Sequence, residues 1–108
     1  MDQDALNLYN TQPDAQERER QRRADEDMRW LMSGPRGRRI AHRQLERCGL
    51  YQQSFAADTH VTAFNEGKRQ IGLKLLADVM RVCPEKHALM MQEQIDDNRN
   101  AGDRRRDD

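Results

Sequence analysis

The side chains best suited to binding chemistry are arginines in the middle of the chain. They recur at intervals of three or four positions, at Arg36, Arg39, Arg43 and Arg47, with Arg38 beside them. On a helix this spacing forms one stripe, and a guanidinium group binds phosphate or carboxylate through two parallel hydrogen bonds. The pattern predicts a surface for an acidic protein partner or for nucleic acid. A solvated helix face with intrachain ion pairs is the alternative interpretation.

Lys68 and Arg69 form a second basic pair, inside the polar run Asn65-Glu66-Gly67-Lys68-Arg69. The run is interpreted as a solvated first part of a helix or, alternatively, as a buried polar junction in which Glu66 pairs with an arginine of the second helix. We place both side chains with the arginine stripe as candidate residues for binding a protein partner or nucleic acid.

The residue pattern gives little support for metal binding or for nucleophilic catalysis. Cys83 and His87 are four positions apart and Cys48 follows His42 by six, but the paired cysteine motif typical of zinc sites is missing. Cys48 lies near the C-terminal end of a predicted helix, where the dipole does not favour a thiolate. Nucleophile-elbow and phosphate-loop motifs are also missing. We therefore expect no enzymatic activity, no metal and no cofactor.

The elements that must position the basic residues are helices. A charged helix with acid-before-base pairs at i,i+4 spacing begins near Pro13 and gains large apolar residues only from Met28 onward. Gly49 marks the end of the second helix, and Pro84 opens the fourth. The predicted fold is all-α, a small helical bundle of three to four helices with a charged N-terminal helix extension and flexible termini. The predicted helices span about 13–32, 35–48, 60–82 and 84–98.

Apolar residues at helical spacing are the predicted core or interface anchors. For Trp30 the core is favoured over an interface. Gly67 and Gly72 interrupt the third helix at a cost of about 1 kcal/mol each, which suggests close approach of another backbone. The anchors are Trp30, Leu31, Phe64, Ile71, Leu75 and Val79.

Composition limits the size and class of the domain. The 108 residues include 19 Lys+Arg and 19 Asp+Glu, and no apolar run is long enough for a membrane-spanning helix. The acidic start predicts no signal peptide, and two cysteines make no disulfide framework.

Residues 28–93 hold eleven basic and six acidic residues, a net charge of +5. We expect a flexible arm at 1–12, a helical domain at 13–98 with its core at about 28–93, and a disordered charged tail at 99–108. Such a small core favours completion by a partner or an oligomer.

Several of these strings together resemble a family of small tailed-phage proteins, the Bordetella-phage-type virion-module domain. The resemblance covers about residues 28–93, and Phe64-Asn65-Glu66-Gly67-Lys68-Arg69 is its most specific part. Lys86-His87 departs from the aliphatic–aromatic pair of the family, so the fourth helix is expected to pack differently. The other matching strings are Trp30-Leu31-Met32, Gly34, Arg36-Gly37-Arg38-Arg39, Leu45-Glu46-Arg47-Cys48-Gly49, Gly72-Leu73, Leu75-Leu76 and Cys83-Pro84-Glu85.

The resemblance implies a gene of a phage morphogenesis cluster and no enzymatic activity. The resulting hypothesis is a non-enzymatic virion protein, an oligomerising or docking subunit of the portal, the tail or the internal genome-ejection apparatus. Its expected partners are phage structural proteins and further copies of itself, with possible DNA contact. Its expected location is the virion, and the host cytoplasm during assembly. The alternative is a phage-encoded nucleic-acid-binding regulator or assembly factor that uses the basic second helix, although the connection after that helix is too long for a helix-turn-helix.

Overall fold

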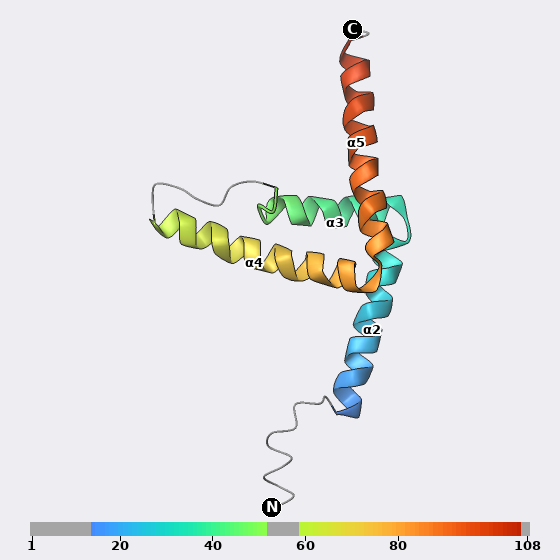
Figure 1. Ribbon diagram of the computed structural model, residues 1–108, viewed down its shortest axis with the longest axis vertical. Coiled ribbons are helices and arrows are strands. Elements are labelled where there is room, and N and C mark those ends of the chain that lie inside the picture. The colour runs from blue at the N-terminus through green and yellow to red at the C-terminus, as the bar shows by residue number, and fades with distance from the viewer. Residues whose placement is uncertain (1–13, 52–58, 107–108) are drawn as a thin grey trace, which may run out of the picture.

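The computed structural model describes residues 14–51 and 59–106 (Figure 1). This part of the chain contains four helices and no strand, which confirms the predicted all-α fold. They are α2 (Ala15–Met32), α3 (Pro35–Arg47), α4 (Thr59–Val82) and α5 (Pro84–Arg106). The predicted arm at 1–12 lies outside the described residues.

Helix α2 begins where an acidic side chain caps it. Asp14 is the N-cap, and its Oδ1 accepts a hydrogen bond of 2.8 Å from the backbone N–H of Glu17. Further along, the guanidinium of Arg22 pairs with both Glu19 and Glu26, at 2.6 and 2.5 Å. These i,i+3 and i,i+4 pairs support a helix whose first turns have no apolar face.

A glycine allows the tight corner between α2 and α3. Pro35 occupies the first turn of α3. A Cβ atom at Gly37 would lie 1.7 Å from the carbonyl oxygen of Leu31. Only a residue without a side chain therefore lets the first turn of α3 pack against the last turn of α2.

Two glycines shape the end of α3 and its packing on α4. Gly49 follows the C-cap Cys48 with φ of 77°, which confirms the predicted stop. A Cβ atom at Gly72 would lie 2.7 Å from the Cβ of Cys48, so the expected close approach occurs there, against side chains. At Gly67 the space is open, and the same expectation was wrong.

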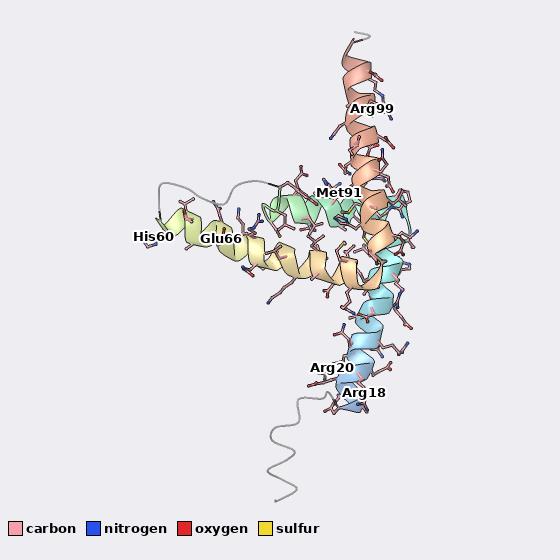
Figure 2. The ribbon with its side chains drawn as sticks, viewed as in Figure 1. Arg18, Arg20, His60, Glu66, Met91 and Arg99 are labelled. Atoms are coloured by element: carbon pink, nitrogen blue, oxygen red, sulfur yellow. The ribbon has the colours of Figure 1, made fainter. Side chains whose placement is uncertain are left out.

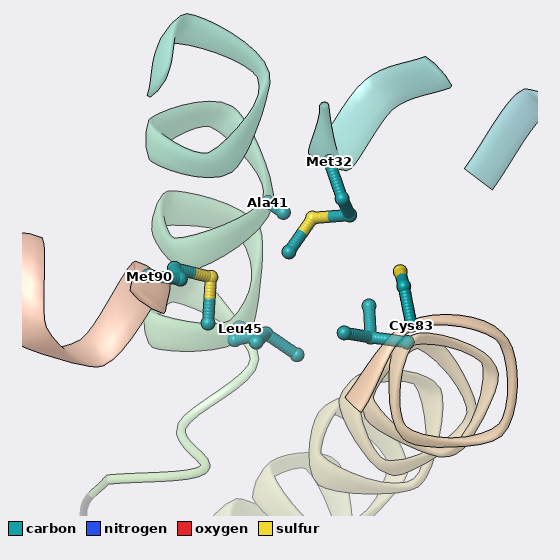
Figure 3. Packing of buried hydrophobic residues seen from close by; sticks show 6 residues of the cluster. Met32, Ala41, Leu45, Cys83 and Met90 are labelled. Carbon is teal, nitrogen blue, oxygen red and sulfur yellow. The ribbon is translucent and has the colours of Figure 1, made fainter. Parts of the chain in front are cut away.

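The hydrophobic core lies where the four helices meet, and all four contribute to it (Figure 3). Val79 is fully buried, and Leu31 and Leu75 pack against the core, as predicted. The buried cluster consists of Met32, Ala41, Leu45, Val79, Cys83 and Met90.

Three predicted anchors are not core residues. Trp30, Phe64 and Ile71 are 78%, 66% and 67% exposed. Helix α4 turns Gly72 and Val79 inward, and Phe64 and Ile71 lie about 60–100° around the helix from these two residues. The core is also confined to the crossing point, so apolar residues outside it stay uncovered.

The helices form a thin, open arrangement in which α2 and α5 project to opposite ends and α3 and α4 run side by side (Figure 1). Along its shortest axis the chain extends only 15 Å. All side chains at 14–24 and 95–104 are exposed, including Arg20 and Arg99 (Figure 2). The predicted disordered tail was wrong for residues 99–106, because α5 continues to Arg106. Once a helix is nucleated, strong helix formers such as arginine extend it without tertiary contacts.

Candidate partner-binding surface

The arginine stripe of α3 is a real surface feature. Arg36, Arg39, Arg43 and Arg47 are all exposed. At about 100° per residue they fall within a sector of roughly 80°, opposite the buried Ala41 and Leu45. None of the four forms an ion pair with another described residue. The four guanidinium groups therefore point to solvent with their hydrogen-bonding capacity unused within this part of the chain.

Arg38 does not belong to this surface, and its prediction as a binding residue was wrong. It is 7% exposed. Its Nε donates a hydrogen bond of 2.6 Å to Oε1 of Glu93, and its Nη1 donates one of 2.8 Å to the carbonyl of Met32. Arg38 thus joins α3 to α5 and satisfies a carbonyl at the end of α2. The sequence contains a feature that could have predicted the burial of Arg38. Arg38 lies three and seven positions before Ala41 and Leu45, and this spacing places it on the apolar face of α3.

Arg69 also acts within the chain. Its Nη1 lies 3.4 and 3.5 Å from the carbonyl oxygens of Leu50 and Gly49, just after the end of α3. A cation there complements the negative end of the α3 dipole. Lys68 remains at the surface, with its Nζ 5.0 Å from the centre of the Phe64 ring.

An apolar groove lies at the corner between α2 and α3. We call it the corner groove. It has a volume of about 230 Å³ and is lined by Trp30, Leu31, Gly34, Arg36, Gly37 and Ile40. Arg36 belongs to both the groove and the arginine stripe, so an apolar and a cationic surface adjoin. Ile40, which is 42% exposed and was missed as a surface residue, lies about 20° beyond Arg47 around α3 and about 100° from Ala41. It therefore borders the stripe and not the apolar face.

The cysteines and histidines do not assemble a reactive centre in the described part of the chain. No three potential metal ligands come together at 14–51 and 59–106. The ring of His42 stacks on that of Tyr51, with 5.4 Å between centroids. Cys83 is a free thiol whose pKa is raised by burial and, to a lesser degree, by the charge of Glu85. None of the described helices is both long and apolar enough to cross a membrane.

Comparison with known proteins agrees with the resemblance expected from the sequence. No curated protein and no solved structure is detectably similar to the chain. A family model does match, over residues 28–92, which begin at the first apolar residues of α2 and end in α5. This segment is more than half of the 108 residues and contains every residue of the core, the arginine stripe and the corner groove. The chain belongs to the family of Bbp19-like phage proteins.

Proposed function

We propose that this phage protein is a non-enzymatic docking subunit of the virion, at the portal, the tail or the internal genome-ejection apparatus. Its arginine stripe would bind an acidic surface of a larger phage structural protein. The observation that carries the proposal is the set of four exposed arginines that form no ion pair with the described residues. In an interface, each guanidinium would gain carboxylate partners that it lacks among residues 14–51 and 59–106.

The open arrangement of the helices supports docking. The core is small, and the projecting parts of α2 and α5 expose all of their side chains at 14–24 and 95–104. Extended helices of this kind offer long contact surfaces. A globular enzyme of the same length would instead be expected to enclose a pocket.

The charge distribution favours a protein partner over DNA. The chain carries no net charge, and residues 14–27 of the α2 region hold six acidic and four basic side chains. These acidic groups would repel a DNA backbone, whereas a protein surface can present acidic groups to α3 alone.

Peptide mass spectrometry on purified virions, with copy-number measurement, tests the virion role. The expected result is a defined small copy number per particle. In phage carrying Arg39→Ser and Arg43→Ser, incorporation should fall several-fold, and the change Lys74→Ser, at an exposed basic residue of α4 outside the stripe and the projecting segments, should leave it unaltered. Absence of the wild-type protein from the particle would contradict the proposal.

The second candidate function is a nucleic-acid-binding regulator or assembly factor, and the same solvent-facing arginines favour it. If all four bind phosphates, the logarithm of DNA affinity should fall with the logarithm of salt concentration with a slope of about −3 to −4. A salt-titrated binding assay on duplex DNA measures this slope. A slope near zero would exclude this function for the stripe.

A further inference from the structure

The corner groove has an exposed aromatic anchor beside a cationic rim. Trp30 is 78% exposed and Ile40 is 42% exposed, and Arg36 borders both the groove and the stripe. Trp and Arg are the residue types that most often dominate protein–protein binding energy. The groove therefore fits a short segment with apolar side chains for the pocket and carboxylates for the rim.

The chain itself contains such a segment, ahead of the described residues. Positions 2–9 read Asp-Gln-Asp-Ala-Leu-Asn-Leu-Tyr, with two acidic groups followed by three large apolar side chains. The segment complements the corner groove and its rim in both charge and polarity. The acidic positions match the arginines, and Leu6, Leu8 and Tyr9 match the apolar lining.

Distance argues against the three large apolar side chains of this segment docking together in the groove of their own chain. Helix α2 carries the chain about 24 Å between Asp14 and Trp30, at 1.5 Å per residue. Leu6, Leu8 and Tyr9 precede Asp14 by eight, six and five residues, which span at most about 29, 22 and 18 Å when fully extended. Leu6 alone could therefore come level with Trp30 of its own chain, and Leu8 and Tyr9 fall short of it. A second copy of the chain has no such restriction.

We propose that residues 2–9 of one copy dock in the corner groove of a second copy. Leu6 and Leu8 would lie against Trp30 and Ile40, and the aspartates would pair with Arg36 and its neighbours on the stripe. Each copy then offers a segment at one end of α2 and a groove at the other. The contact is head-to-tail, and copies joined in this way form a ring if the rotation closes and a filament if it does not.

The purified full-length chain provides a direct readout, because Trp30 is its single tryptophan. Analytical ultracentrifugation and Trp emission are measured over one concentration series. As concentration rises, the sedimentation coefficient should increase and the emission should shift to shorter wavelength in parallel. The double change Leu6→Ser with Leu8→Ser should weaken association by about ten-fold or more.

Matched variants separate the groove from general surface effects. Ile40→Ser should weaken association as the double change does, whereas Ile95→Ser, at a comparably exposed isoleucine on α5, should not. A mixture of the Leu6/Leu8 variant with the Ile40 variant should recover association that stops at two chains, because it contains one intact segment and one intact groove.

Two results would overturn the proposal. One is association and Trp emission that the Leu6/Leu8 change leaves as in the wild type. The other is a chain that stays monomeric while the Leu6/Leu8 change still shifts its Trp emission, which would mean that the segment covers its own groove. The inference deepens the proposed docking role, yet its test uses the isolated chain, so a failure of the virion experiment and a failure here are distinguishable.

Discussion

Replacing Arg38 by methionine gives the most direct test of the internal packing. Methionine retains much of the apolar stem of the arginine and removes its charge and donors. Glu93 would lose a hydrogen bond of 2.6 Å, and the Met32 carbonyl would lose one of 2.8 Å. We expect Arg38→Met to destabilise the fold strongly although Arg38 was predicted as a surface residue.

The size of the effect follows from the two hydrogen bonds. Each bond from a charged group contributes about 1.5–3 kcal/mol. The Glu93 side chain is 22% exposed, so water replaces part of its lost interaction and values at the lower end apply. The sum is about 3 kcal/mol, a large fraction of the 5–15 kcal/mol typical of a domain.

Urea unfolding followed by circular dichroism measures this loss. With a slope of about 1.5 kcal/mol per molar, the midpoint should fall by about 2 M. Arg39→Met, at the exposed neighbouring position, should change stability by no more than about 0.5 kcal/mol. If Arg38→Met unfolds within 0.5 kcal/mol of the wild type, the assignment of Arg38 to the interior is refuted.

Three further predictions concern the backbone, an ion pair and a thiol. Gly37→Ala should destabilise the fold by about 3 kcal/mol through overpacking, whereas Gly67→Ala, in open space, should stabilise it by about 1 kcal/mol. Thermal unfolding of both variants beside the wild type should therefore give a lower midpoint for the first variant and a higher midpoint for the second. The hydrogen bond from Arg81, followed by that from Gln21, lowers the pKa of Asp25. The stabilisation is therefore present above about pH 4 and is lost as pH falls through the folded-state pKa. The stability difference between wild type and Asp25→Asn should vanish below that range in urea titrations at several pH values. Cys83 should react with iodoacetamide more slowly than the less buried Cys48, because burial shields its thiol and raises its pKa; equal rates for the two cysteines would contradict this.

Local signals predicted the helices well because caps and breakers act within a few residues. Pro35, Gly49 and Pro84 each mark a boundary that the structure shows within a residue or two. The end of α5 was missed because residues 99–106 contain no proline, and the single glycine, Gly102, does not stop a helix that has already formed. Composition alone, rich in charge and poor in apolar residues, indicated disorder there.

The site was harder to predict than the helices, because burial depends on where helices cross. Arg38 and Arg39 are neighbours of the same type, yet one is buried against α5 and the other is exposed. Trp30 is large and apolar, but it lies on the side of α2 opposite Met28 and Met32, which pack in or against the core. The four remaining arginines of α3 were predicted correctly as exposed because regular spacing fixes a common face.

The projecting parts of α2 and α5 bear on how such a protein can change over time. No described side chain at 14–24 or 95–104 is buried, and the family match stops short of both segments. Adding or deleting a helical turn of about 5.4 Å there would shift the reach of each end and leave the core intact. The central segment could thus stay constant while the two ends are fitted to assemblies of different dimensions, so that helix length is set by the neighbour and not by folding.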